Sequence, residues 1–263
     1  MTPGYARPRS ELPWLPYESL DRVIINAHNF TPPPVVVSGE VHWWCPSLDD
    51  TGNGTTTLND RVGSRNGTLT NFALSGTTSN WTADTGSGGI RAIASDGVND
   101  IITMSSIASL SGDIFWCAWI KPASTGRDAC ILATRNIFTG AARSGIALYW
   151  RDANGNNIAA EVVLAGTRYT AILNTTLALN TWYWVYGERN GTTGVVTVGV
   201  DGVGTATASG TTATITHETG PCICSWRDYT IGSFPGRVDD LRIFNKRPTN
   251  SERTAMASKR GYV

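Results

Sequence analysis

The stretch from residue 179 to residue 202 constrains the fold more than any other part of the chain. Residues 182–186 are aromatic or β-branched, the types that occupy a pleated, half-buried surface. Asn190-Gly191 and Gly194 supply turn conformations, and a run of valines over residues 195–200 carries the chain back. Residues 182, 184 and 186 face one side of such a strand and residues 183 and 185 the other, and both sides are apolar. The stretch therefore predicts a β-hairpin buried inside a sandwich.

The rest of the chain predicts many short strands joined by turns. Gly and Thr are abundant and long helical periodicity is absent, which is typical of an all-β protein. Residues 49–69 read as a Gly/Asn/Asp-rich loop, and Thr249-Asn250-Ser251-Glu252 is a capping box that predicts a short helix through Met256. Besides the hairpin, strands are expected over residues 40–48, 90–104, 113–121, 131–134, 145–150, 158–164, 169–173, 229–232 and 236–244.

Several segments resemble one family when they are taken in order. Trp182-Tyr183-x-Val185 with Val198-x-Val200-Asp201-Gly202 is similar to a run found in laminin-G-like domains of the concanavalin A-like lectin/glucanase superfamily. The other matching segments are residues 43–49, 95–100, 115–122 and 234–244. The resemblance implies that residues 39–263 fold as a two-sheet antiparallel jelly-roll sandwich with a short C-terminal helix. A shared fold does not by itself assign a function.

Residues 1–38 form a separate, extended N-terminal arm. Seven of the twelve prolines lie there, and proline fixes φ and removes a hydrogen-bond donor. The arm also carries more apolar side chains than a solvated tether needs, so we expect it to dock on a neighbouring subunit of an assembly. The residues expected to make this contact are Trp14, Leu15, Tyr17, Ile24, Ile25 and Phe30.

Composition excludes some functions and bears on the compartment. The formal net charge is +0 and no basic patch stands out, so nucleic acid is not expected as a partner. No apolar run approaches the ~20 residues of a membrane span, and residues 1–20 do not resemble a secretory leader. The five scattered cysteines lack the spacing of a redox or zinc pair. We expect free thiols in a protein made in a reducing cytoplasm.

Catalytic residues are not evident. Glycosidases on jelly rolls need two carboxylates that face each other across a cleft, and the seven glutamates here are isolated. Asp239 and Asp240 are adjacent, so regular alternation would point them to opposite faces of a strand. The sequence therefore predicts a protein that is not an enzyme.

A structural calcium ion is one interpretation of the loop around residue 60. Asp60, Ser64 and Asn66 offer the hard oxygen ligands that Ca²⁺ takes. The resemblance implies that Asp239 backs such a site. Arg61 and Arg65 depart from the family's pattern, and a loop held only by side-chain to backbone hydrogen bonds is the alternative.

Aromatic residues beside loops are candidates for sugar stacking, because sugar-binding jelly rolls use exposed rings as platforms. A tryptophan in a sandwich is also a common core residue, and both interpretations stay open. The candidate platforms are Trp81, Trp150, Trp226 and Tyr229.

Three functions follow from these observations. The first is a non-catalytic structural protein of an oligomeric assembly, such as a decoration or fibre protein of a virion or other extracellular particle. Its arm would anchor it, and its jelly-roll head would be free to contact surface glycans. The second is a carbohydrate-binding or adhesion module without an assembly role. The third is a glycoside hydrolase, which the absence of paired carboxylates disfavours.

Overall fold

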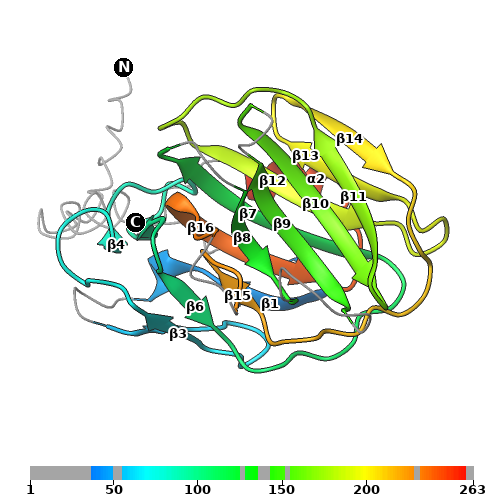
Figure 1. The fold of residues 1–263 in the computed structure, drawn as a ribbon, viewed down its shortest axis with the longest axis horizontal. Coiled ribbons are helices and arrows are strands. Elements are labelled where there is room, and N and C mark those ends of the chain that lie inside the picture. The colour runs from blue at the N-terminus through cyan, green and yellow to red at the C-terminus, as the bar shows by residue number, and fades with distance from the viewer. Residues whose placement is uncertain are drawn as a thin grey trace, which may run out of the picture.

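The protein is a two-layer β-sandwich. The computed structural model describes residues 37–49, 55–124, 128–135, 143–151, 155–227 and 232–258. These residues form two antiparallel sheets, A and B, stacked face to face (Figure 1). The prediction of an all-β jelly-roll sandwich with a short C-terminal helix is confirmed. Residues 1–36 of the predicted arm of residues 1–38 lie outside the described residues.

Sheet A follows the order β14-β13-β12-β7-β16-β5-β4, and β1 also pairs with β16. Its strands are β1 (Glu40–Trp44), β4 (Asn80–Thr82), β5 (Ala92–Asp96), β7 (Ile114–Pro122), β12 (Tyr183–Arg189), β13 (Val196–Val200), β14 (Gly204–Ala208) and β16 (Pro235–Phe244). A 3₁₀ turn, η1 (Pro46–Leu48), follows β1, and the helix α2 (Asn250–Ala257) follows β16.

Sheet B follows the order β11-β10-β9-β8-β15-β6-β3-β2. Its strands are β2 (Thr57–Leu58), β3 (Gly67–Thr70), β6 (Ile101–Thr103), β8 (Ala129–Ala133), β9 (Gly145–Arg151), β10 (Asn157–Leu164), β11 (Thr167–Leu173) and β15 (Cys222–Ile223). Strands β9, β10 and β11 form the broad front layer in Figure 1, with β12 and β13 behind them.

The hairpin predicted from residues 179–202 is β12 and β13, and β12 lies between β13 and β7. Val185 packs in the core between the sheets. Trp184 and Tyr186 pack in a second cluster on the opposite face of sheet A. The expected alternation and the burial of both faces are confirmed.

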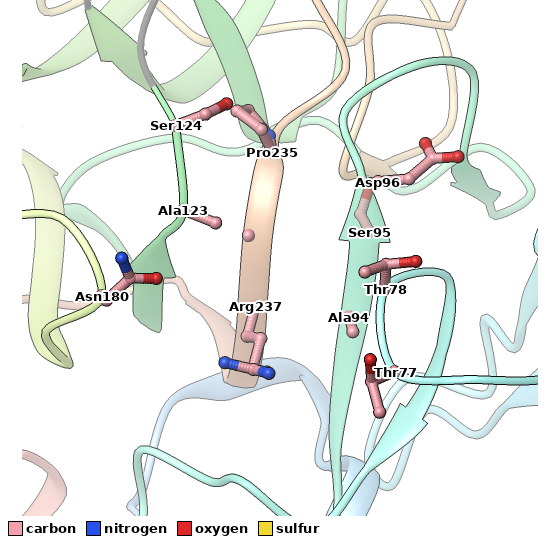
Figure 2. Close-up of a pocket in the computed structure, with 11 residues that line it drawn as sticks. Thr77, Thr78, Ala94, Ser95, Asp96, Ala123, Ser124, Asn180, Pro235 and Arg237 are labelled. Carbon is pink, nitrogen blue, oxygen red and sulfur yellow. The ribbon is translucent and has the colours of Figure 1, made fainter.

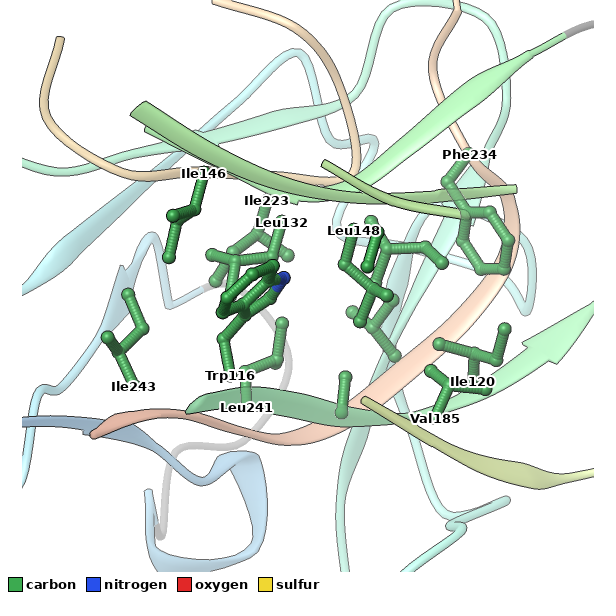
Figure 3. Packing of buried hydrophobic residues seen from close by; sticks show 14 of the residues in the cluster. Trp116, Ile120, Leu132, Ile146, Leu148, Val185, Ile223, Phe234, Leu241 and Ile243 are labelled. Carbon is green, nitrogen blue, oxygen red and sulfur yellow. The ribbon is translucent and has the colours of Figure 1, made fainter. Parts of the chain in front are cut away.

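The core between the sheets is filled by branched aliphatic side chains around Trp116 (Figure 3). Trp116 comes from β7, and its Nε1 donates a hydrogen bond to the carbonyl of Ala147 in sheet B at 3.2 Å. Gly187 of β12 lies directly opposite in the register. A Cβ at Gly187 would lie 2.4 Å from the indole, so the glycine makes room for the ring.

Helix α2 covers part of the outer face of sheet A. Met256 and Ala257 pack against the cluster that contains Phe115 and Phe244. The helix begins with the predicted capping box, in which Thr249 accepts a hydrogen bond from the Glu252 backbone and the Glu252 side chain accepts one in return. The helix therefore closes sheet A on the side that sheet B does not cover.

Strand β16 contains a β-bulge after Asp239, where its pairing with β7 shifts register. Val238 and Leu241 both pack in the core between the sheets, so Asp239 and Asp240 share the other face. The expectation that their carboxyl groups point to opposite faces is wrong, because the extra residue interrupts the alternation. Asp240 is left with φ of 48°, and Arg242 holds its carboxylate at 2.9 Å.

Some elements differ from the sequence-based expectation. The loop expected over residues 49–69 contains β2 and the start of β3, and the strands β4, β14 and β15 were not predicted. Residues 229–231 of one expected strand lie outside the described residues, and Gly232 is not in a strand. The missed strands are short or rich in Gly and Thr, and backbone pairing holds them more than apolar alternation does.

All five cysteines are free and buried, which confirms the prediction of free thiols. Burial raises the pKa of the thiols of Cys45, Cys117, Cys130 and Cys224. These thiols are therefore protonated, apolar parts of the packing.

We predict that Gly187→Ala lowers the free energy of unfolding by about 1–3 kcal/mol, because the new methyl group overpacks against the Trp116 indole. Urea denaturation measures this loss. In a Trp116→Phe background the same substitution should cost less, since the smaller ring leaves space. Equal losses in both backgrounds would show that the indole does not limit the space at Gly187.

Candidate functional site

A groove of about 410 Å³ opens where β5, β7 and β16 reach one end of sheet A (Figure 2). We call it the first groove. Most of its side chains are hydroxyls, an amide or charged groups, and aromatic rings are absent from its described lining. It is lined by Thr77, Thr78, Ala94, Ser95, Asp96, Ala123, Ser124, Asn180, Pro235, Gly236 and Arg237.

Local backbone geometry shapes the walls of the first groove. Gly236 brings β16 close to β7, because a Cβ there would lie 2.3 Å from the Lys121 carbonyl oxygen. Asn180 has φ of 58°, a left-handed conformation that asparagine tolerates, and its N–H donates to the Pro122 carbonyl at 2.7 Å. Figure 2 shows Asn180 and Ala123 on one side of Arg237, with β5 on the other side.

Charged side chains gather around Arg237, which lines the first groove. Asp84 Oδ2 forms an ion pair with Arg237 Nη1 at 2.6 Å and accepts a hydrogen bond from Lys121 Nζ at 2.8 Å. Asp84 Oδ1 accepts from the Trp182 indole at 2.9 Å. We call these four residues the Asp84 cluster. Arg237 Nε is buried and has no hydrogen-bond partner among the described residues, and the ion pair with Asp84 restrains the guanidinium.

The Asp84 carboxylate is an anchor for cations and not a proton donor. Burial alone would raise its pKa, but hydrogen bonds from Lys121 and Trp182 lower the pKa below its ordinary value. A general acid needs the opposite shift. The Asp84–Arg237 pair therefore contributes a restrained guanidinium to the groove and no proton donor of the kind a general acid needs.

Sequence reasoning did not select the first groove or Trp182. The lining comes from separate segments, so no motif marks it. Trp182 is partly buried and packs beside Trp119 over Gly86 on the outer face of sheet A. The available signal was its position two residues before Trp184, which places both rings on the same face of the sheet. Because the hairpin was interpreted as core, Trp182 was not considered as a site residue.

The candidate stacking residues lie elsewhere. Trp81 and Trp150 are in the core between the sheets, and Trp226 packs against Tyr149 with the Arg135 guanidinium 4.8 Å from its ring centre. All three are at most 4% exposed. The expectation of exposed platforms at these positions differs from the structure, because both faces of each ring are covered by protein. Tyr229 lies outside the described residues.

The residues expected to bind calcium are occupied by hydrogen-bond donors. Asp60 Oδ1 accepts from the backbone of Trp43, Val62 and Gly63, and Oδ2 accepts from His42 and the Arg65 backbone. Burial would raise the Asp60 pKa, but the His42 and backbone hydrogen bonds lower it well below its usual range.

Asn66 and one of the two carboxyl oxygens of Asp239 also accept from protein donors, while Asp239 Oδ1 is buried without a partner among the described residues. Asn66 Oδ1 accepts from the Asp60 backbone at 3.0 Å, and Asp239 Oδ2 accepts from Gly86 and Ser87. Within the described ranges, no group of three or more His, Cys, Asp or Glu residues could hold a metal ion. As arranged here these residues do not fit a calcium ion, and calcium binding stays a prediction.

The proposed docking residues Trp14, Leu15, Tyr17, Ile24, Ile25 and Phe30 lie outside the described residues. Nothing in the structure bears on the contact that they were expected to make. In the part of the chain that is described, no helix has the length and apolar character of a membrane span.

We predict that the free energy of unfolding of Asp239→Asn increases relative to that of wild type as the pH rises. Burial, and then the charge of Asp240, raises the pKa of Asp239 to about 7. The folded chain therefore holds this proton more tightly than the unfolded chain, so ionisation reduces wild-type stability as the pH rises toward that value. Asparagine does not titrate, and the difference in unfolding free energy should move by about 2 kcal/mol in its favour from about pH 5 to about pH 8.

Urea denaturation at both pH values measures this difference. Asp201→Asn, at an exposed turn, is the control and should follow the wild-type pH dependence. Parallel pH curves for Asp239→Asn and wild type would mean that the Asp239 carboxyl does not change its proton affinity on folding.

Similar solved structures share this architecture. Domain 4 of an extracellular GH43 arabinanase from Geobacillus stearothermophilus, in complex with arabinotriose, has a TM-score of 0.60 at 18% identity, over 83% of this chain and 98% of that one. The botulinum neurotoxin serotype D binding domain has a TM-score of 0.54 at 15% identity, over 83% of this chain and 50% of that one. At these identities the likeness shows the fold alone.

In a third structure the similar region covers more of the present chain but a smaller share of the other protein's chain. Trypanosoma rangeli sialidase with the inhibitor DANA has a TM-score of 0.55 at 15% identity, over 92% of this chain and 38% of that one. The chain thus spans about half or less of the toxin and sialidase chains. A comparison with curated proteins gives no match.

A family model gives the direct sequence match. The model described as the concanavalin A-like lectin/glucanases superfamily matches residues 96–252, more than half of the chain. The match includes β7, the β12–β13 hairpin and β16, the strands on which the resemblance rested. The chain belongs to the concanavalin A-like lectin/glucanases superfamily.

Proposed function

We propose that this protein binds glycans without cleaving them, and that the first groove is the binding site. The observation that carries the proposal is the groove's lining of neutral hydrogen-bonding groups around one fixed guanidinium and one carboxylate, that of Asp96. Sugar hydroxyls both donate and accept hydrogen bonds. Thr77, Thr78 and Ser124 can do the same, while Asn180 and Arg237 give direction.

The restraint on Arg237 favours binding. Its ion pair with Asp84 fixes the guanidinium before a ligand arrives, so little side-chain entropy is lost on binding. Trp182 donates a hydrogen bond to the other oxygen of Asp84, and this residue is partly exposed. A partly exposed indole beside fixed polar groups is a common arrangement for a sugar ring.

The described lining also supports binding without catalysis. A glycosidase needs a second carboxyl group facing the first, and Asp96 is the one carboxylate among the described lining residues. Asp84 is held by two cations, and Asp239 and Asp240 are at most 2% exposed. None of these three groups is placed to protonate a bound sugar.

Two similar structures were solved with sugars. The arabinanase domain holds arabinotriose, and a botulinum neurotoxin serotype D ligand-binding domain holds N-acetylneuraminic acid. These sugars were bound by those proteins, and neither was observed with the present chain. They support the choice of glycans as the ligand class to test first.

We predict that Asn180→Gly lowers affinity for a bound glycan about tenfold, because it removes the amide from the groove wall. Glycine keeps the positive φ of 58° without strain, so the melting temperature should stay near that of wild type. A glycan array followed by isothermal titration calorimetry measures the change.

Asn156→Gly is the matched control, since Asn156 also has a positive φ, of 60°, and lies away from the first groove. It should leave affinity unchanged. The absence of glycan binding by wild type would refute the proposal, as would turnover of a polysaccharide. If Asn180→Gly and Asn156→Gly bound the glycan with equal affinity, the binding site would lie outside the first groove.

A role in an assembly is the second candidate, and the composition of the arm of residues 1–38 favours it. Seven prolines and many apolar residues, among them the six docking residues named above, give an extended segment suited to docking on another subunit. The chain would then be a decoration or fibre-like protein of a virus particle that displays its jelly-roll head. This role is compatible with glycan binding.

We predict that a chain without residues 1–36 loses association with its particle or multimer but keeps glycan affinity. The cut spares Val37, which is buried against Phe115 and Phe244. Light scattering measures oligomeric state, and co-sedimentation with the native particle measures docking. Unchanged association after the deletion would rule out the arm as the anchor.

A further inference from the structure

Strand β14 is a free edge of sheet A. It pairs with β13 on one side, and no described residue pairs with its other side. Figure 1 shows β14 at the margin of the sandwich, beside β11. Gly204, Thr205 and Thr207 of this strand are exposed. One row of its backbone N–H and C=O groups therefore faces solvent, and such a row is a template for another strand.

The other described edges of the two sheets carry features that deter strand addition. Strands β2 and β4 have two and three residues. The outer side of β1 is bridged by Asp60 and receives the Arg61 N–H. Strand β11 presents the exposed charge of Arg168. Strand β14 consists of Gly, Thr and Ala, and its pairing with β13 runs without a bulge, so it has no such protection.

An apolar seam lies beside this edge, between β14 and β11. Ala206 and Ala208 of β14 and Tyr169 of β11 pack against the core between the sheets and are only partly buried. A Cβ at Gly204 would lie 3.9 Å from the Leu173 side chain, so the two edge strands face each other. A strand added to β14 with apolar side chains at alternate positions would cover this seam.

A second groove, of about 370 Å³, opens at the start of β14 on the outer face of sheet A. The β13–β14 turn forms one wall, and Asn250 and Thr254 of α2 form the other. Val203 at the turn is 41% exposed. A strand on β14 that turns two alternate residues toward the seam turns the residue between them to the side of the groove. The surface therefore fits a short segment with three consecutive apolar residues.

The N-terminal arm contains a segment of this kind. Residues 17–31 are its longest stretch without proline, so each of them can donate its N–H to a strand ladder. Within this stretch Val23, Ile24 and Ile25 are β-branched, the residue type that favours strands. Added to β14, such a strand turns Val23 and Ile25 to the seam and Ile24 to the second groove.

The arm joins the sandwich on the side of sheet A away from β14. Val37 is buried in the outer-face cluster, and Ser38 accepts a hydrogen bond from Lys246 at 3.0 Å. The strand that follows, β1, lies five strand spacings from β14, or about 24 Å. The twelve residues from 26 to 37 span up to about 40 Å when extended, so an arm can reach the β14 edge of a copy placed alongside.

We infer that residues 22–26 of one copy's arm add as a strand to the β14 edge of a second copy. The inference rests on the assembly role proposed above and names the surface that receives the arm. Within one chain α2 stands between arm and edge, since it packs in the same cluster as Val37 and lines the second groove. Two copies that bring these sides together can instead exchange arms reciprocally, which is a low-cost route to a dimer.

The first test is a cross-link between two full-length variants. Ile24→Cys is mixed with Thr207→Cys and treated with a short bis-maleimide, from which burial shields the five native thiols. Mass spectrometry should find a covalent dimer with one copy of each variant. In the control, Thr70→Cys replaces Thr207→Cys. Thr70 is exposed on β3, near the opposite edge of sheet B, and should give no more dimer than wild type.

The second test is self-association of the full-length chain, measured by analytical ultracentrifugation. Thr207→Lys places a charge on the free edge and should weaken self-association at least about tenfold. Thr70→Lys is the matched control and should leave it unchanged. Both threonines are exposed, so the melting temperatures should stay near that of wild type.

The outcomes separate this inference from the assembly role. Cross-linking within single chains that carry both Ile24→Cys and Thr207→Cys, without dimer formation, overturns the exchange of arms. A monomeric wild type, equal cross-linking to Thr70→Cys, or self-association that Thr207→Lys does not weaken overturns β14 as the acceptor. In these cases the assembly role still stands if particle association requires residues 1–36. Association that survives their removal overturns the assembly role and the inference together.

Discussion

The central strands of sheet A are buried on both faces, and this constraint governs the rest of the structure. Sheet B covers the inner face of β7, β12 and β16, and α2 with its aromatic cluster covers much of the outer face. A polar group in such strands must find its partner within the protein. Asp240 with Arg242, and Glu188 with Arg247 and Arg253, are the results of that requirement. Ligand chemistry is therefore confined to the ends and turns of these strands.

Much of the fold could be predicted because its signals are local. Within residues 179–202, the turn residues and the alternation of apolar side chains predict the hairpin and both of its buried faces. The capping box at Thr249 is recognised from four adjacent residues. The strand β14 (Gly204–Ala208) gave no such signal, because it is held by pairing with β13. The bulge at Asp239 was also hidden, since an extra residue in a strand is defined by its partner strand.

The candidate site could not be predicted for a related reason. Arg237, Asp84 and Trp182 meet through an ion pair and a hydrogen bond between residues far apart in the sequence. The tryptophans chosen from loop positions illustrate the opposite error. Trp150 stands at the end of β9 and yet points into the core, because its place in the alternation and not its nearness to a turn decides its direction.

The burial of all five thiols has a consequence for how the sandwich can be studied. Each sulfur is covered on folding, and those whose pKa is raised are least nucleophilic in the closed state. An alkylating reagent would reach them when strands separate, so labelling would report opening events. Because Cys117 lies under α2 and Cys130 and Cys222 lie on sheet B, mass spectrometry of the labelled positions would resolve which layer opens first.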